Sequence, residues 1–151
     1  MKPRVYLGSD HAGFRLKEAV REFLEKAGFA VEDIGAYSYD AEDDYPDFIH
    51  KVALKTARDR QSKGIVFGGS GQGEAITANK VKGIRAALYY GKNVEILELS
   101  RTHNDANVLS LGARFLTERD AIKAIKIWLN TPFSNKERHL RRIRKISKLE
   151  K

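Results

Sequence analysis

Hydrophobic residues recur along the chain with two alternating patterns, one typical of strands and one typical of helices. Short apolar runs predict strands over residues 5–8, 29–34, 65–67, 84–89 and 107–111. The segments between and after them predict helices over residues 16–27, 74–80, 93–100 and 117–129. A strand followed by a helix, repeated along the chain, predicts a mostly parallel sheet that helices cover on both faces.

Two further helices are predicted from their first residues. Pro46 suits the first turn of a helix that places Phe48, Val52 and Ala53 inward. Ser134 and Glu137 have the spacing of a capping box and predict the start of a terminal helix. No internal repeat, low-complexity tract or linker interrupts the pattern, so residues 1–151 are expected to form a single α/β domain.

Composition narrows the class of protein. The chain contains 151 residues, 42% of them hydrophobic, and this is enough for a substantial core. The absence of cysteine excludes disulfides, thiolate metal sites and cysteine nucleophiles. No apolar run reaches the roughly 18 residues of a membrane span, and the first residues lack the apolar stretch of a signal peptide. A cytoplasmic protein that does not contact membranes is therefore expected.

The net charge of +8 is concentrated at one end of the chain. Residues 136–151 hold eight Lys or Arg and two Glu, a net of +6, which leaves +2 for the rest. Such a segment suits a nucleic-acid arm, a solvated helix or a local anion site. Arg138 and Arg142 are four residues apart and share one helix face, where two guanidinium groups suit a phosphate.

A glycine-rich loop over residues 68–74 carries the most specific signal. It follows a predicted strand and precedes a predicted helix, so its backbone amides can bind an anion or an oxyanion. The loop matches neither a Walker A motif nor G-x-G-x-x-G, and a tight turn without a ligand is the alternative. Glu74 either caps the helix or serves as a base beside the amide donors, the pairing that proton abstraction next to a carbonyl requires.

Histidines mark two further loops. Asp10 and His11 end the first predicted strand, at the edge where open α/β sheets bind ligands. His103 precedes the fifth strand, and Arg114 follows it as another candidate for an anion. Surface positions are the alternative for each histidine, and His50 is interpreted as solvated. No spacing of metal ligands appears, so no metal site is predicted.

These residues together resemble the ribose-5-phosphate isomerase B and galactose-6-phosphate isomerase family, over nearly the full length of the chain. The matching segments are Gly8-Ser9-Asp10-His11-Ala12-Gly13, Asp44-Tyr45-Pro46, the loop from Gly68 to Glu74, Ala78-Asn79-Lys80, Gly83-Ile84-Arg85-Ala86, His103-Asn104, Gly112-x-Arg114 and Arg138-His139-x-Arg141-Arg142. Individually several are weak, but their order and spacing are specific.

The resemblance implies a Rossmann-like α/β/α sandwich with five parallel strands and a basic C-terminal helix. It also implies a homodimer or larger homo-oligomer with active sites shared between subunits, and no metal or organic cofactor. By analogy, Glu74, Ser70, His103 and Asp10 are the catalytic residues, with His103 opening the sugar ring and Asp10 binding hydroxyls. The residues implied to bind substrate are His11, Tyr45, Gly69, Gly71, Gly73, Asn104, Arg114, Arg138 and Arg142.

One position departs from many relatives, which carry a catalytic cysteine where this chain has Gly68. A second branch lacks that cysteine and has the Ser-Gly-x-Gly-Glu form found at residues 70–74, so the resemblance assigns proton transfer to Glu74.

The sequence thus predicts an aldose–ketose isomerase acting on a phosphorylated sugar, with ribose 5-phosphate to ribulose 5-phosphate as the expected reaction. Galactose 6-phosphate, allose 6-phosphate and a tetrulose phosphate are the alternative substrates. A nucleic-acid-binding module that uses the basic helix is the alternative class, although no nucleic-acid motif accompanies that helix.

Overall fold

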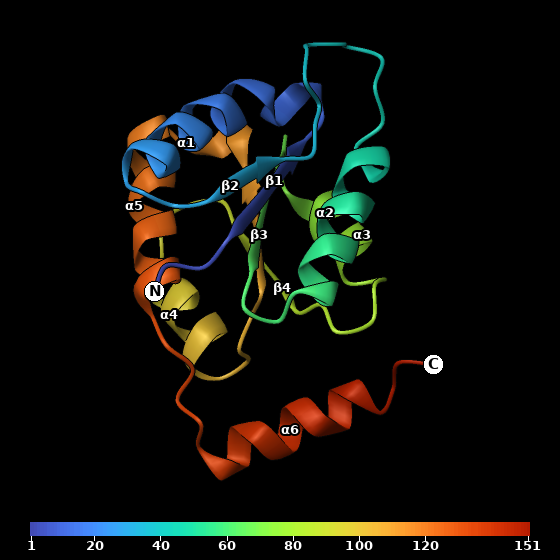
Figure 1. The fold of residues 1–151 in the computed structure, drawn as a ribbon, viewed down its shortest axis with the longest axis vertical. Helices are drawn as coiled ribbons and strands as arrows, with labels where there is room; N and C mark the ends of the chain where they lie inside the picture. Colours follow the sequence, from blue (N-terminus) through green and yellow to red (C-terminus); the bar gives the residue numbers. More distant parts are fainter.

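A computed structural model describes all 151 residues and contains one five-stranded sheet flanked by helices (Figure 1). The strands are β1 (Val5–Ser9), β2 (Val31–Asp33), β3 (Lys63–Gly68), β4 (Ala86–Tyr89) and β5 (Val108–Gly112). They are all parallel and lie in the order β2-β1-β3-β5-β4. The helices are α1 (Phe14–Lys26), α2 (Pro46–Arg58), α3 (Gln72–Ala78), α4 (Glu95–Thr102), α5 (Glu118–Asn130) and α6 (Glu137–Ser147), with short 3-10 turns at η1 (His11–Gly13) and η2 (Ala113–Phe115).

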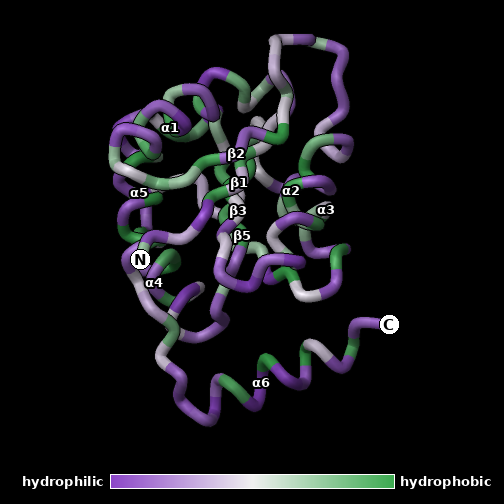
Figure 2. Tube along the Cα trace, viewed as in Figure 1, coloured by the Kyte–Doolittle hydropathy of each residue, from purple (hydrophilic) through white to green (hydrophobic).

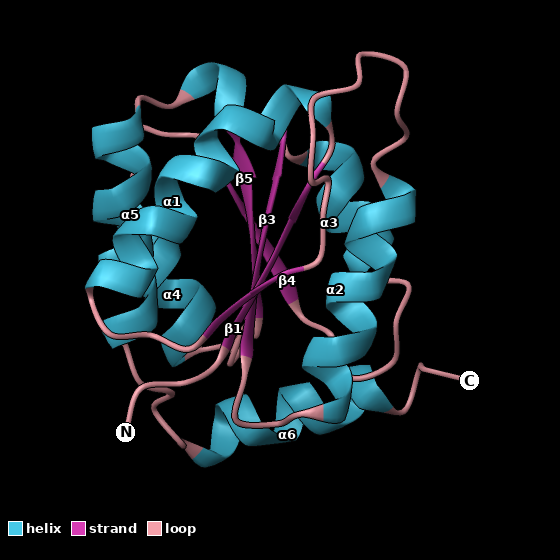
Figure 3. Ribbon diagram, turned by 45° about the horizontal axis from the view of Figure 1, so that its top comes forward, coloured by secondary structure: helices cyan, strands magenta, loops and turns pink.

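Helices cover both faces of the sheet, which confirms the predicted α/β/α sandwich. Figure 3 shows α1, α4 and α5 on one side of the strands and α2 and α3 on the other. Successive strand residues point to opposite faces, so Val5 and Leu7 pack with α1, α4 and α5, whereas Tyr6 packs with α2. Figure 2 shows the resulting concentration of hydrophobic residues in the middle of the molecule. No helix combines the length and the apolar character that crossing a membrane requires.

The terminal helix begins differently from the prediction. The capping box is wrong, because α6 starts at Glu137 with Lys136 as its N-cap, and no side chain caps it. Asn135 has a φ of 56°, and this left-handed turn directs the hydroxyl of Ser134 to the amide of Lys136 instead (3.4 Å). The carboxylate of Glu137 pairs with Arg144 (3.3 Å). In α2, Val52 and Ala53 are buried as predicted, but Phe48 is only partly buried and Ile49 is fully buried.

One cation lies entirely inside the fold. Lys17 of α1 is 0% exposed, and its ammonium group donates to the carboxylates of Asp33 (2.6 Å) and Glu18 (3.0 Å). The other carboxylate oxygen of Asp33 accepts a hydrogen bond from the amide of Gly35 (2.9 Å). This pair therefore fixes the end of β2 and the start of the connection that runs to α2.

The two edges of the sheet carry different groups. The glycine loop, η1 and η2 follow the carboxyl ends of β3, β1 and β5, while α6 lies along the edge where the strands begin (Figures 1 and 3). The tail after α6 contacts this amino edge, because Glu150 accepts a hydrogen bond from the amide of Gly83 (2.9 Å).

Candidate active site

A cavity of about 470 Å3 opens where the chain leaves neighbouring strands β1 and β3 in opposite directions. From β1 the chain continues into α1 on one face, and from β3 into α3 on the other face. A crevice at such a topological switch point is the usual ligand site of an open α/β sheet. The lining residues are Asp10, His11, Ala12, Asp43, Asp44, Tyr45, Gly69, Ser70, Gly73, Glu74 and Arg114.

The glycine loop presents backbone amides that have no partner in the chain. The amides of Gly69, Ser70 and Gly71, which precede α3, and the amide of Gly73 in its first turn donate to no other backbone group and to no side chain. Gly71 adopts a φ of 79°, and its carbonyl is fixed by the buried hydroxyl of Ser110 (2.7 Å). Unpaired amides at a helix start are donors available to an anion or an oxyanion.

Glu74 lies in the first turn of α3 and is only 4% exposed. Burial raises the pKa of its carboxyl group, and the nearby charge of Asp10 acts in the same direction, while a bond to its own backbone amide opposes them. No cation forms an ion pair with Glu74. A buried carboxylate with a raised pKa and without a counter-ion is well suited to accept a proton.

The position of Glu74 depends on Gly68. A Cβ atom added at Gly68 would overlap the carboxylate group of Glu74. A side chain at residue 68 and the carboxylate at residue 74 therefore compete for the same space. Glycine at residue 68 therefore leaves room for the carboxylate of Glu74 in this chain.

Two larger side chains close over the loop. The ring of Tyr45, which precedes α2, lies so close to Gly73 that a Cβ atom there would overlap it. The guanidinium group of Arg114 lies over Gly69 in the same way, and the amide of Arg114 donates to the carbonyl of Gly69 (3.0 Å). Tyr45 and Arg114 thus both lie at the cavity, beside different residues of the loop.

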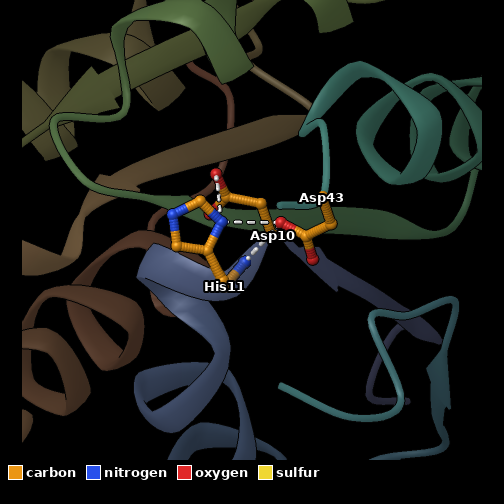
Figure 4. A group of neighbouring side chains, drawn as sticks. All are labelled: Asp10, His11 and Asp43. Carbon is orange, nitrogen blue, oxygen red and sulfur yellow. Dashed lines mark hydrogen bonds and ion pairs between the residues drawn. The ribbon is translucent and has the colours of Figure 1, made fainter. Parts of the chain in front are cut away.

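Asp10, His11 and Asp43 form a cluster on one wall of the cavity (Figure 4). Asp10 caps η1, since its carboxylate accepts from the amides of Ala12 (3.0 Å) and Gly13 (3.3 Å). The Nδ1 atom of His11 lies 2.7 Å from Asp43 Oδ1 and 3.9 Å from Asp10 Oδ2. Potential ligand atoms of these three residues lie within 4.8 Å of one another, so the cluster is also the one group that could hold a metal ion.

The remaining predicted residues lie elsewhere. His103 and Asn104 follow α4, and Arg138 and Arg142 are on α6, so all four are at the amino edge of the sheet. His103 stacks on His139, with ring centroids 4.1 Å apart and planes 18° apart. Within one chain the structure therefore does not bring these four residues to the cavity of Glu74.

Two residues in this arrangement were missed by the sequence analysis. Asp43 stands next to the recognised Asp44-Tyr45-Pro46 segment, but three consecutive acids are also typical of a solvated loop. His139 lies within the basic run of the terminal helix and is 5% exposed, but no feature of the neighbouring sequence indicates that it is buried.

The fold and this site define an α/β protein that combines a buried carboxylate with an amide anion site at a topological switch point. The Ribose/Galactose Isomerase family model matches residues 5–146. The chain is 47% identical over 148 residues to ribose-5-phosphate isomerase B of Mycolicibacterium paratuberculosis, covering 98% of this chain and 92% of that protein.

Solved structures agree with the sequence comparison. Ribose-5-phosphate isomerase B of Clostridium thermocellum superimposes with a TM-score of 0.91 at 41% identity, covering 97% of each chain. That of Mycoplasma genitalium, solved with bound ribulose 5-phosphate, superimposes with a TM-score of 0.93 at 40% identity, covering 99% of this chain and 97% of the other. The chain belongs to the ribose/galactose isomerase family.

Proposed function

We propose that this protein interconverts ribose 5-phosphate and ribulose 5-phosphate through an enediolate, with Glu74 as the base. The observation that carries the proposal is a buried carboxylate without a counter-ion beside four unpaired amides. Relatives named ribose-5-phosphate isomerase B and a structural neighbour with bound ribulose 5-phosphate support this choice of substrate.

The proposed reaction moves one proton between two carbon atoms. The carboxylate of Glu74 removes the proton from C2 of the open aldose, and the electron pair forms the C1–C2 double bond of the enediolate. Amides of the loop from Gly69 to Gly73 and the hydroxyl of Ser70 stabilise the negative oxygen. Glu74 then returns the proton to C1 while the hydroxyl proton of O2 passes to O1, and this gives the ketose. Asp10 binds sugar hydroxyls.

The phosphate needs more positive charge than the cavity of one chain supplies. Four carboxyl groups line it, against Arg114 and His11. Arg138 and Arg142 are exposed on α6 at the other edge of the sheet. In a two-fold dimer, a contact between the amino edge of one subunit and the cavity of the other occurs twice, so one kind of contact would complete both sites.

Exposed apolar side chains agree with such an assembly. Ile96 and Leu99 on α4 are 49% and 38% exposed, and Tyr90 and Phe115 are 50% and 65% exposed. We therefore propose a homodimer in which His103, Asn104, Arg138 and Arg142 of one subunit complete the cavity of the other.

Activity is tested by incubating the protein with ribose 5-phosphate in heavy water and following ketose formation and deuterium incorporation by NMR. Isomerisation through an enediolate exchanges the transferred proton with solvent. Galactose 6-phosphate, allose 6-phosphate and a tetrulose phosphate serve as comparison substrates. Failure to interconvert any of them would refute the proposed activity, and a clear preference for another sugar would refute the choice of substrate.

Site sharing is tested by mixing inactive variants. Hybrids of Glu74→Gln and His103→Ala subunits contain one site with both defects and one intact site. Statistical mixing should therefore restore about a quarter of native activity. Mixing Glu74→Gln with Asp10→Ala is the matched control and should restore none, because both changes affect the same cavity. No recovery in the first mixture would contradict shared sites.

A further inference from the structure

The connection between β2 and α2 supplies Asp43, which contacts His11. The proposed reaction assigns no role to this contact. One oxygen of Asp43 accepts two hydrogen bonds from the same residue: from the backbone amide of His11 (3.0 Å) and from its Nδ1 (2.7 Å). The side chain of Asp43 is 9% exposed, and its second oxygen is buried without a partner. A carboxylate in this position fixes both the place of η1 and the rotation of the imidazole ring.

The orientation of the ring determines which nitrogen faces the ligand. With Nδ1 donating to Asp43, the proton on that nitrogen is fixed, and Nε2 is left on the opposite edge of the ring (Figure 4). Tyr39 contacts the ring edge-on, with centroids 6.1 Å apart, and limits its rotation from another side. The imidazole also lines the cavity, so Nε2 is the ring atom available to a bound phosphate.

We infer that Asp43 is a positioning residue that presents Nε2 of His11, as a charged donor, to the phosphate group of the substrate. The inference rests on the proposed function, and it concerns a residue that has no assigned part in that function. Asp43 acts through His11 and does not itself contact the sugar.

The surroundings of the ring act in both directions on the pKa of His11, and the net effect is to raise it. The hydrogen bond to Asp43 raises the pKa of His11, burial lowers it, the charge of Asp10 raises it, and Arg114 lowers it. Asp44 and Glu74 add negative charge to the same cavity. An imidazolium held between these carboxylates keeps its Nε2 proton to higher pH than a free histidine, and its bond to phosphate is charge-assisted.

The test separates the charge of Asp43 from its hydrogen bonds. Asp43→Asn keeps an acceptor for both His11 donors but removes the charge. We expect KM for ribose 5-phosphate to rise about three- to tenfold, with little change in kcat, because a charge-assisted bond is replaced by a weaker one. The increase should be largest between the pKa of His11 in the variant and its higher pKa in the native protein, where only the native ring is charged. Asp40→Asn, in the same connection, is the matched control and should behave as native.

A second measurement does not depend on isomerase activity. The NMR titration of the His11 ring, with and without inorganic phosphate, should show a lower pKa and weaker phosphate binding in Asp43→Asn than in the native protein. An inactive protein with this difference would refute the proposed function but not the role of Asp43.

Three results would overturn the inference. One is a native KM and a native His11 titration in Asp43→Asn. Another is an equal effect of Asp43→Asn in a His11→Gln background, which would show that Asp43 only fixes the loop. The third is loss of activity on chelation that a divalent cation restores, which would show that Asp10, His11 and Asp43 hold a metal instead.

Discussion

Replacing Glu74 by Gln should change activity and stability in opposite directions. The substitution keeps the size and most of the hydrogen-bonding capacity of the side chain, but it removes the base. Loss of a general base typically lowers the rate by roughly 10²–10⁴-fold, and kcat for ribose 5-phosphate should fall by about that factor. KM should change much less, because the phosphate contacts remain.

The stability effect follows from the burial of the carboxylate. Glu74 is 4% exposed and has no ion pair, and burial raises the pKa of its carboxyl group. A raised folded-state pKa means that the folded protein binds the proton more tightly than the unfolded chain. The stability contributed by the protonated form is therefore present below the unfolded pKa of about 4.3 and is lost as pH rises through the folded pKa.

A neutral glutamine avoids this loss. At neutral pH, Glu74→Gln should keep or increase the free energy of unfolding, by an amount on the order of 1 kcal/mol. Each kcal/mol corresponds to about 2–4 °C in Tm for a chain of this size. If Glu74 only capped α3, the same change would lower stability by about 1 kcal/mol or less and leave turnover intact.

Steady-state kinetics and thermal melts from about pH 5 to about pH 8 measure the effects of the substitution on kcat and on stability. In the native protein, kcat should decline as pH falls below the raised pKa of Glu74, because the base is then protonated. Glu74→Asp is a useful control, because it keeps the charge but withdraws it from the cavity. Its kcat should lie between that of the native protein and that of Glu74→Gln. A Glu74→Gln variant with nearly native kcat, or one that melts several degrees lower, would refute the assignment.

Substitutions at three further positions test other parts of the structure. Lys17→Ala leaves the carboxylate of Asp33 buried without its cation and should lower the free energy of unfolding by about 3–5 kcal/mol, measured by urea denaturation; a change below about 1 kcal/mol would contradict this. Gly68→Ala places a methyl group where the carboxylate of the base lies and should reduce kcat strongly while the protein stays folded, as circular dichroism would show. His139→Ala removes the ring stacked on His103 and should lower kcat/KM, whereas His139→Phe keeps a flat ring and should retain most activity; equal losses would argue against stacking as the cause.

Much of the fold was predictable because its signals are local. Alternation in the strands and the three- and four-residue spacing in the helices gave the elements, and the alternation of elements gave the parallel sheet. The strand order was not predictable, because β5 inserts between β3 and β4 and no local pattern records that choice. The predicted start of α6 was also wrong, because the left-handed turn at Asn135 moves the beginning of the helix.

The candidate site was predictable only in part, because some of its residues are placed by local signals and others by long-range packing. Asp10, Glu74 and Arg114 each follow a strand, and parallel strands bring their carboxyl ends to one edge. The separation of His103 and Arg138 from this edge depends on where α4 and α6 pack, which is a long-range property of the fold. Nothing near Asp43 in the sequence shows that its partner is His11, 32 residues away.

The connection between β2 and α2 shows how charge holds the site in place. It contains Asp40, Glu42, Asp43 and Asp44, a composition that disfavours a fixed conformation through mutual repulsion. Its start is held by Asp33, which is bound to buried Lys17 and accepts from the amide of Gly35. Its end is held by the two hydrogen bonds from His11 to Asp43, directly before Tyr45 closes over the glycine loop. Both ends of the connection are therefore held by charged groups that lie against a partner of opposite charge. The segment between these two anchors has no helix or strand of its own, and its last part supplies Asp43, Asp44 and Tyr45 to the cavity.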